Sequence, residues 1–445
     1  MKNDGKLEFE TLKTNKKRIY GLCGFVCVVG LLIILITNSS LAKYRVTESI
    51  PLINGTINYE LSDLNLIGVY IEDGNDYTKV DQIPDSGYTF NSEKSYCKIG
   101  DEKQDMTITY DMNTKTLNIA PMTTKGTKCY LYFDEQKILL ADAIKRDNQI
   151  NSGTPNFANI ATTNEGVYKA QDDWGDSYYF RGAVNNNWVK FANFYWRIIR
   201  INGDGSIRMI YSGNGSPATT GTSTQISTSA FHSTYNNNNM YVGYMYTSGQ
   251  VHGLGTNSTI KGVLDSWYQT NIANKGYGDQ ISKETGFCGD REPSTNSSTS
   301  NGAGGTGTTV TYYGGYIRLT NSTKSPTLKC KNNEDMYTVS GSSRGNKALT
   351  NPVGLITADE VAMAGGVYGQ TNQSYYLYTN SAYWTMSPYL FNASFSFAFV
   401  FYVNSSGYLN GSNVSNTIGV RPVINLSADV TAKSGNGTSS KPYEI

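Results

Sequence analysis

The sequence predicts a mainly β protein with an α+β C-terminal domain, preceded by a transmembrane helix and a small β-sandwich. Short runs typical of strands fill most of the chain, and turn residues separate them. Helical periodicity is confined to a few segments. One uncharged apolar stretch near the N-terminus is long enough to cross a bilayer.

The composition limits the possible functions of the chain. Its 445 residues allow two or three domains. Lys and Arg number 37 against 36 for Asp and Glu, so the strongly basic character of a nucleic-acid-binding domain is absent and no nucleic-acid partner is expected. Tyrosine is abundant, with 34 residues beside 45 glycines and tracts of Asn, Ser and Thr. This mixture is typical of antibody-type recognition loops, although tyrosine also fills strand positions in exported β proteins.

The N-terminal segment predicts a single-pass membrane anchor. Residues 19–37 carry no charge, and the basic residues of the tail 1–18 precede them. The positive-inside rule places this tail in the cytoplasm and the rest of the chain outside the cell. Ser40-Leu41-Ala42 offers an alternative, because cleavage there would make the segment a long signal peptide of a secreted protein. We favour the anchor because the apolar run is longer than a usual signal sequence.

Four cysteines follow the anchor, and their even number suggests two disulfides in an exported protein. Three pairings are possible. Proximity along the chain favours Cys97–Cys129 and Cys288–Cys330, and four free buried thiols are the alternative.

Residues 43–134 predict a β-sandwich stalk, in which Asn54-Gly55 and Asp73-Gly74 supply turns. Its predicted strands are 43–49, 56–61, 66–72, 106–110, 116–120 and 129–133. The following segment, 135–147, has apolar residues at helical spacing and predicts a linker helix.

Residues 148–445 predict a single larger domain of strands and loops with few helices. A hairpin turn at 202–205 joins two of its predicted strands. Two helices are predicted, at 259–273 and at 357–364, where Thr357 and Glu360 form a capping-box pattern. The predicted strands are 178–181, 188–191, 195–201 and 207–211.

The C-terminal stretch has the clearest pattern in the chain. From 391 to 403 the odd positions are apolar, mostly Phe, and the even ones are mostly small or polar. This period of two predicts one strand that carries aromatic residues along one side. A last buried strand is predicted at 420–426, with an edge or a bulge at Arg421-Pro422 because proline cannot donate to a ladder.

Several motifs carry a family resemblance that covers about 150–445. They are F-Y-W-R-I-I-R-I-N-G at 194–203, V-G-Y-M-Y at 242–246, S-T-I-K-G-V-L-D-S-W-Y at 258–268, W-T-M-S-P at 384–388 and G-V-R-P-V-I-N-L at 419–426. Together they resemble an uncharacterised exported domain family of low-GC Gram-positive gut bacteria. The resemblance implies a C-type lectin-like fold for 148–445, similar to formylglycine-generating enzymes and to the variable proteins of diversity-generating retroelements. The 43–134 region is similar to a β-domain that precedes this module in anchored proteins.

The retroelement resemblance implies a hypervariable binding segment at 389–416, because adenine-directed mutagenesis yields the residue types that are dense there. A fixed surface is the alternative. In either case we expect a cell-surface ligand, protein or glycan, to bind this segment. The expected ligand-binding residues are Tyr389, Leu390, Asn392, Ser394, Ser396, Tyr402, Tyr408, Asn410, Ser412, Asn413, Ser415 and Asn416.

No enzyme, metal or cofactor motif stands out in the sequence. His232 and His252 are the only histidines, and both lie in loop-like tracts. The acidic cluster Asp172, Asp173 and Asp176 is typical of turn hydrogen bonding before a strand. We therefore expect a binding protein and no catalysis, metal or cofactor. The alternatives are a structural envelope protein without a discrete ligand and, less favoured, a surface enzyme on the same fold.

Overall fold

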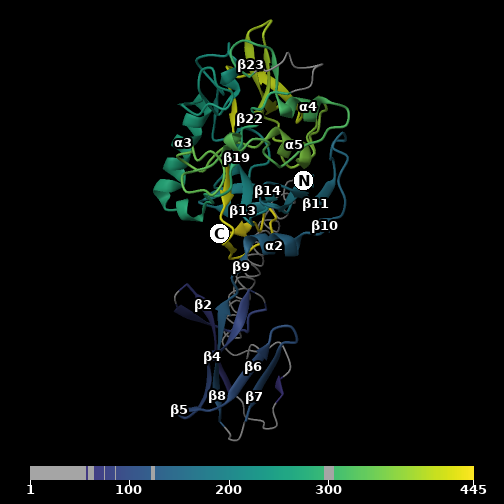
Figure 1. The fold of residues 1–445 in the computed structure, drawn as a ribbon. Helices are drawn as coiled ribbons and strands as arrows, with labels where there is room; N and C mark the ends of the chain where they lie inside the picture. Colours follow the sequence, from purple (N-terminus) through teal and green to yellow (C-terminus); the bar gives the residue numbers. More distant parts are fainter. Residues whose placement is uncertain (1–56, 59–64, 75, 86, 122–125, 295–304) are drawn as a thin grey trace, which may run out of the picture. The chain divides into compact units, whose positions relative to one another are not determined.

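The computed structural model describes residues 57–58, 65–74, 76–85, 87–121, 126–294 and 305–445 (Figure 1). Strands make up 40% of the structure and helices 14%, which confirms the mainly β prediction. The chain divides into a first unit that ends at Gln136 and a second unit, Lys137–Ile445.

The predicted anchor 19–37, its basic tail 1–18, the alternative cleavage site and the strand 43–49 lie outside the described residues. None of the helices within the described residues has the length and apolar character needed to span a bilayer.

The described residues of the first unit form two sheets that share one small core. Buried side chains from both sheets meet there, among them Leu131 and Phe133 from one sheet and Ile108 and Leu117 from the other. The five-stranded sheet has the order β3 (Asp76–Val80), β2 (Asn65–Asp73), β8 (Lys128–Glu135), β4 (Tyr88–Ile99) and β5 (Glu102–Gln104). The three-stranded sheet has the order β1 (Ile57–Asn58), β7 (Thr116–Ala120) and β6 (Thr107–Asp111).

The disulfide Cys97–Cys129 joins β4 to β8 in this core, as proximity in sequence predicted. β3, β4 and β5 were not predicted from the sequence. In β4 the pairing with β8 is irregular between Asn91 and Tyr96, which breaks the alternation of apolar and polar residues that would have indicated a strand.

An eight-stranded sheet forms one half of the second unit, and the predicted hairpin at 202–205 joins two of its antiparallel strands, β14 and β15. Its strands are β10 (Ile150–Asn151), β11 (Asn164–Gln171), β12 (Asp176–Gly182), β13 (Trp188–Phe191), β14 (Phe194–Ile201), β15 (Ile207–Asn214), β26 (Val423–Leu426) and β28 (Tyr443–Glu444).

A six-stranded sheet forms the other half. Its strands are β16 (Ser227–Ser229), β20 (Thr311–Tyr312), β22 (Tyr383–Asn392), β23 (Phe397–Val403), β24 (Leu409–Asn413) and β25 (Ile418–Val420).

The chain passes from this sheet to the eight-stranded one at Arg421-Pro422, between β25 and β26. The prediction of one continuous strand over 420–426 is therefore wrong. The proline ends the pairing, and the buried Arg421 guanidinium donates to the Tyr211 carbonyl at 3.2 and 3.0 Å.

Four α-helices lie within the described residues. The predictions at 259–273 and 357–364 are confirmed, and the latter has its capping box between Thr357 and Glu360. The predicted helix 135–147 begins only at Leu140, because Ile138 and Leu139 pair with a strand near the C-terminus, and its buried residues belong to the core of the second unit. The helices are α2 (Leu140–Asp147), α3 (Thr259–Asn271), α4 (Gly314–Thr320) and α5 (Ala358–Ala364).

Short elements complete the second unit. The paired short strands are β9 (Ile138–Leu139) with β27 (Thr431–Ala432), β17 (Met245–Tyr246) with β18 (Thr256–Asn257), and β19 (Phe287–Cys288) with β21 (Met336–Tyr337). The 3-10 turns are η1 (Thr222–Thr224), η2 (Asn239–Val242), η3 (Ala273–Lys275), η4 (Gly278–Gln280) and η5 (Asn333–Asp335).

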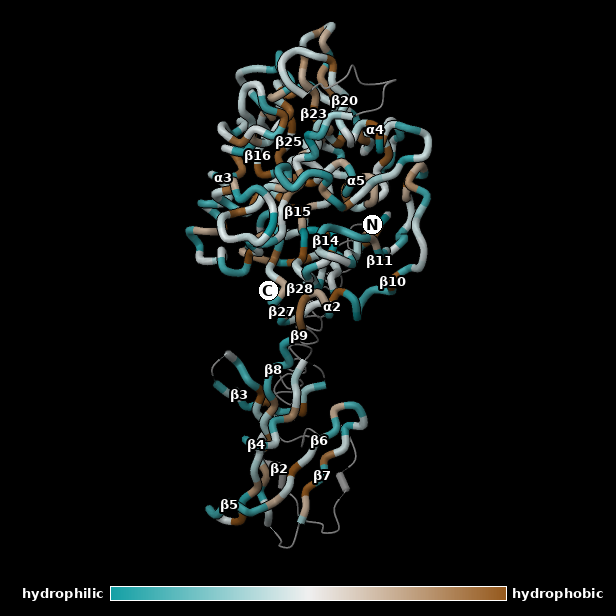
Figure 2. Tube along the Cα trace, in the orientation of Figure 1, coloured by the Kyte–Doolittle hydropathy of each residue, from teal (hydrophilic) through white to brown (hydrophobic). Residues whose placement is uncertain are grey.

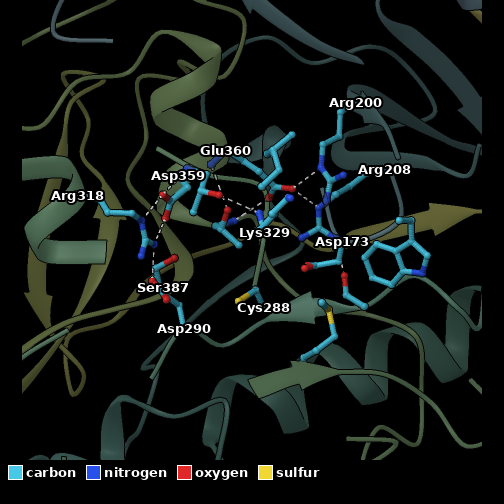
Figure 3. Close-up of a pocket in the computed structure, with 16 residues that line it drawn as sticks. Asp173, Arg200, Arg208, Cys288, Asp290, Arg318, Lys329, Asp359, Glu360 and Ser387 are labelled. Carbon is cyan, nitrogen blue, oxygen red and sulfur yellow. Dashed lines mark hydrogen bonds and ion pairs between the residues drawn. The ribbon is translucent and has the colours of Figure 1, made fainter. Parts of the chain in front are cut away.

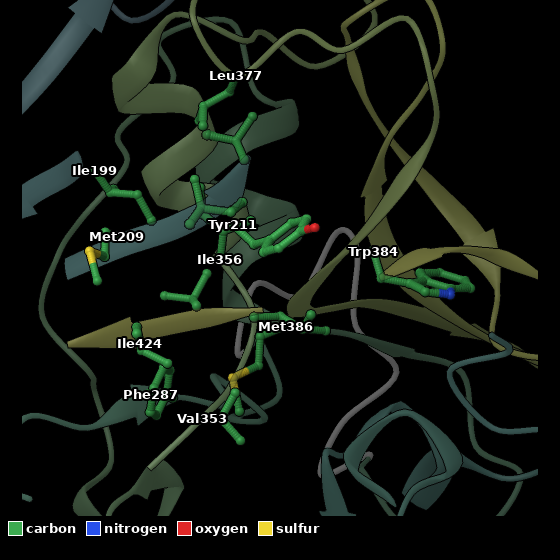
Figure 4. Close-up of a cluster of buried hydrophobic side chains, with 14 of the residues drawn as sticks. Ile199, Met209, Tyr211, Phe287, Val353, Ile356, Leu377, Trp384, Met386 and Ile424 are labelled. Carbon is green, nitrogen blue, oxygen red and sulfur yellow. The ribbon is translucent and has the colours of Figure 1, made fainter. Parts of the chain in front are cut away.

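One hydrophobic core joins the two sheets of the second unit (Figure 4). Met209 from the eight-stranded sheet and Met386 and Trp384 from the six-stranded sheet belong to it. Figure 2 shows hydrophobic residues along the strands of both units and hydrophilic residues mainly in the connections. The shared core fixes β22, which carries the first of the expected ligand-binding residues.

Candidate functional site

The segment 389–416 folds as two hairpins, β22–β23 and β23–β24, and does not form the single strand predicted over 391–403. A turn at 393–396 interrupts that strand, and Ser396 adopts a positive φ of 51°. The prediction was wrong because the alternation of phenylalanines continues in phase through the turn. No glycine or proline marks the reversal.

One side of these hairpins carries an aromatic surface, which we call the aromatic face. Cross-strand pairing puts Leu390 and Asn413 beside Phe399, and it puts Asn392 beside Phe397. Most of these side chains are half-buried, and 39% of Phe397 is exposed. The aromatic face consists of Tyr389, Leu390, Asn392, Phe397, Phe399 and Asn413, four of which are among the expected ligand-binding residues.

Tyr389 is held firmly at one end of the aromatic face. Its ring meets Phe401 edge-on, with 4.9 Å between centroids, and its hydroxyl lies 2.7 Å from that of Tyr368. The ring covers Gly411 so closely that a Cβ there would lie 2.2 Å from it. Burial, followed by the hydrogen bond with Tyr368, raises the pKa of the Tyr389 hydroxyl. Tyr389 is therefore a rigid, neutral part of the surface.

The other expected ligand-binding residues do not join this face. Tyr402 and Asn410 pair with each other on the opposite side of the sheet, where the Tyr402 ring packs against Trp384. Ser412 is buried on that side as well. The remaining residues lie in or beside turns: Ser394 and Ser396 between β22 and β23, Tyr408 before β24, and Ser415 and Asn416 after β24.

A loop from a distant part of the sequence lies against the hairpins. The Asn236 carbonyl accepts from the Ala398 N–H at 2.7 Å, and the Asn236 amide donates to Asn413 at 3.2 Å. This brings Tyr235, 55% exposed, near the hairpins that carry Phe395, 68% exposed, and Phe397. None of these three aromatic residues was among the expected ligand-binding residues. Chain separation hid Tyr235, and the binding face was expected from the polar positions of the false strand, which excluded its phenylalanines.

A second candidate site is a polar cavity of about 30 Å³, which has room for one or two water molecules (Figure 3). On one side, Glu360 pairs with Arg200 at 3.1 Å and with Arg208 at 2.5 Å. On the other side, Arg318 bridges Asp290 at 2.6 Å and Asp359 at 2.7 Å.

These pairings govern the charge states in the cavity. Burial raises the pKa of Glu360, but the two arginines outweigh it, and the net pKa lies below its usual value. For Asp290 burial dominates, and its pKa is raised in spite of Arg318. Each of the three arginines therefore faces at least one carboxylate in the cavity.

Of the acidic cluster noted in the sequence, Asp173 lines this cavity, while Asp176 pairs with Lys169. Asp172 accepts from the backbone N–H groups of Trp174 and Gly175 at 2.8 and 3.0 Å, which confirms the turn role predicted for it. Asp172 also pairs with Arg200 at 2.6 Å, a contact that the sequence did not suggest. Among the described residues, no group of His, Cys, Asp and Glu has a geometry suited to a metal ion.

The cysteines beside this cavity form the second predicted disulfide, Cys288–Cys330, with 5.5 Å between Cα atoms. The Cys330 N–H donates to Asp173 at 2.9 Å. Burial raises the pKa of Asp173, and the bond from Cys330 opposes that rise. Because the two sulfurs are bonded to each other, neither can act as a free thiol while the disulfide is intact.

His252 sits close to this disulfide in a network of charged groups. Its Nδ1 lies 3.1 Å from Asp335 and its Nε2 lies 3.2 Å from Glu292. Arg291 also pairs with Asp335, at 2.7 Å, and Lys331 lies 3.9 Å from Glu292. The hydrogen bond with Asp335 raises the pKa of His252, although burial opposes it.

We predict that His252 makes stability pH-dependent. Its folded-state pKa is raised. The contribution of the charged ring is therefore fully present below the pKa of about 6.5 in the unfolded chain, and it is lost as the pH rises through the folded-state pKa. Urea unfolding of the full chain should show His252→Gln less stable than wild type by up to about 1 kcal/mol at low pH, with a smaller difference at high pH.

His232 provides the matched control for this prediction. Burial lowers its pKa, so its contribution is present above the unfolded-state pKa and lost as the pH falls through the folded-state pKa. His232→Gln should therefore show the opposite trend with pH. Identical trends for the two variants would contradict the assignment.

Comparisons with known protein families, with curated proteins and with solved structures found no match for this chain. The lectin-like resemblance therefore remains a prediction.

Proposed function

We propose that this chain is an extracellular binding protein that residues 19–37 hold in the membrane. The second unit, in which we infer a C-type lectin-like module, binds a glycan or a protein at the cell surface through the aromatic face. Tyr389 supplies a rigid contact area, and Asn392 and Asn413 supply adaptable hydrogen bonds. The two disulfides support a location outside the cytoplasm.

The distribution of exposed apolar side chains supports this proposal most directly. Five large hydrophobic side chains are exposed among the described residues. All three aromatic ones, Tyr235, Phe395 and Phe397, belong to the hairpin that bears the aromatic face or to the loop bonded to it. Clustered exposed aromatic residues are typical of binding sites, whereas single ones are scattered over ordinary surfaces.

We predict that Phe397→Ser weakens ligand binding about tenfold, because aromatic anchors contribute a large share of the binding energy. The full chain is first screened against immobilised glycans and cell-surface proteins, and titration with the ligand then compares wild type and variant. Ile150→Ser is the matched control, since Ile150 is equally exposed, at 39%, but lies on β10 in the other sheet. Equal affinities for the two variants, or the absence of any ligand, would count against the proposal.

We also propose that a retroelement diversifies 389–416. Eleven of its twelve expected ligand-binding residues are half-buried or exposed, and Ser412 is the buried one. A genome that encodes a reverse transcriptase and a near-copy of this segment differing only at adenines would support diversification. The absence of both leaves a fixed binding surface.

A further inference from the structure

A second surface of interest lies on the first unit, on the outer side of its five-stranded sheet. Along β8, Leu131 and Phe133 point into the core, and Tyr130 and Tyr132 alternate with them toward the other side. Pairing places Tyr96 of β4 beside Tyr130, and Tyr70 of β2 beside Tyr132. We call this surface the tyrosine–lysine face. It consists of Tyr70, Tyr96, Tyr130, Tyr132, Lys98, Lys103 and Lys128.

The four tyrosines of this face stand side by side. Tyr70 and Tyr132 stack with 4.9 Å between centroids and 11° between planes. Tyr96 and Tyr130 stack at the same distance with 19° between planes. Neighbouring strands are themselves only about 4.8 Å apart, so the rings stand upright on the sheet. Their inner faces are covered by each other, and the Lys103 and Lys98 ammonium groups lie over the rings of Tyr96 and Tyr130, at 4.1 and 5.6 Å from the centroids. All four tyrosines remain partly exposed.

Three lysines form a row next to these rings. Lys98 pairs directly with Lys103 on one side and with Lys128 on the other. Like charges that face each other across strands destabilise a sheet. Lys98 lies 3.8 Å from Asp101, while the described residues offer neither Lys103 nor Lys128 a carboxylate within ion-pair distance. An anionic partner would relieve this repulsion.

Carboxylates lie at both ends of this sheet: Asp101 and Glu102 lie at the lysine end, and Asp134 and Glu72 lie toward the other end, where both accept hydrogen bonds. Asp134 accepts from the Tyr77 hydroxyl and, at 2.7 Å, from the Asn91 amide. Glu72 accepts from the Glu135 N–H at 2.9 Å. Strand alternation turns Glu102 to the opposite side of the sheet from Lys103, so on the outer side the three lysines have Asp101 alone as a carboxylate within ion-pair distance among the described residues. That end of the outer side is complementary to a negatively charged partner.

We propose that the tyrosine–lysine face binds a polysaccharide that carries carboxylate groups. The lysine ammonium groups pair with the carboxylates, and the tyrosine hydroxyls hydrogen-bond to sugar hydroxyls. Single-stranded nucleic acid fits less well, because its bases need open ring faces for stacking and these rings already stack on one another. This site is separate from the aromatic face and adds a second ligand class to the protein.

The test measures binding of fluorescent polygalacturonate to the full chain at low salt, with the fully methyl-esterified polymer as the uncharged equivalent. We expect binding of the acid form alone, and we expect it to weaken as salt rises. Replacing all three lysines (Lys98→Gln, Lys103→Gln, Lys128→Gln) should weaken binding about tenfold or more. Tyr96→Phe with Tyr130→Phe keeps the ring stack and should weaken it several-fold through loss of the hydroxyls.

Two controls separate a specific site from general charge attraction. Lys275→Gln, Lys283→Gln and Lys433→Gln remove the same charge from exposed positions of the second unit and should leave binding unchanged. Phe397→Ser should also bind polygalacturonate like wild type, so failure of the aromatic-face proposal is distinguishable from failure of this one. The proposal is overturned if the full chain does not bind, if the methyl ester binds equally, if both lysine triples lose affinity equally, or if oligo-dT competes as well as polygalacturonate.

Discussion

Glu360→Gln is expected to destabilise the second unit by about 3–5 kcal/mol, because it removes one charge from a buried ionic network. Glu360 is 3% exposed and pairs with Arg200 and with Arg208, which are 5% and 1% exposed. Arg200 keeps Asp172 as a partner at 2.6 Å, whereas Glu360 is the sole carboxylate in ion-pair distance of Arg208 among the described residues. The substitution therefore leaves Arg208 as a buried charge without a counter-ion.

Glutamine isolates the effect of charge in this experiment. Its side-chain oxygen can still accept from the Thr357 N–H, so the capping box that begins α5 is preserved. Glu334→Gln is the control, since Glu334 is exposed and forms no ion pair among the described residues, and its effect should stay within about 0.5 kcal/mol. Urea unfolding followed by tryptophan fluorescence measures both. A loss below about 1 kcal/mol for Glu360→Gln would mean that water reaches and solvates Arg208.

Local patterns predicted those parts of the fold that local interactions determine. The helix at 357–364 follows from a capping box, and the one at 259–273 follows from its apolar periodicity after the capping Ser258. By contrast, α4 begins with Gly314-Gly315, which disfavours a helix, and its Arg318 is fixed by carboxylates from other elements. This helix depends on tertiary contacts, which join residues far apart in the chain and therefore leave no pattern in a short stretch of sequence.

In the candidate site too, local patterns predicted some of the residues, and contacts between distant parts of the chain placed the others. Tyr389, Leu390, Asn392 and Asn413 were expected to bind ligand and lie on one face. Strand alternation puts Leu390 and Asn392 on the same side, whereas Tyr389 joins them because the pairing of β22 with β23 shifts register between Pro388 and Leu390. Tyr235 could not be predicted, since the Asn236–Ala398 bond that positions it joins residues far apart in the chain. Phe395 and Phe397 were left out of the expected site for a different reason. The turn at 393–396 contains no glycine or proline, so the period of two runs through it and predicts a single strand.

Removing the disulfide of the first unit is expected to have an effect as large as that of Glu360→Gln. The Cys97–Cys129 bond closes a loop with a sequence separation of 32, which corresponds to about 3–4 kcal/mol of chain entropy. The core of this unit is small, and both cysteines are completely buried in it. Cys97→Ala with Cys129→Ala should lower the unfolding midpoint of the first unit by about 10–30 °C, or prevent its folding.

The disulfide of the second unit is the control for this experiment. Cys288–Cys330 closes a slightly longer loop, with a separation of 42, so chain entropy alone would predict an equal or larger loss for Cys288→Ala with Cys330→Ala. The second unit, however, has a much larger core and a buried ionic network that do not depend on this bond. Hydrogen exchange on the full chain should then show global opening of the first unit when Cys97 and Cys129 are replaced. When Cys288 and Cys330 are replaced, opening should be confined to the neighbourhood of these two residues, and the strands around Trp384 should stay protected. If the first unit stays protected without its disulfide, its two sheets hold together by packing alone, and the cysteine pair is not what stabilises this unit.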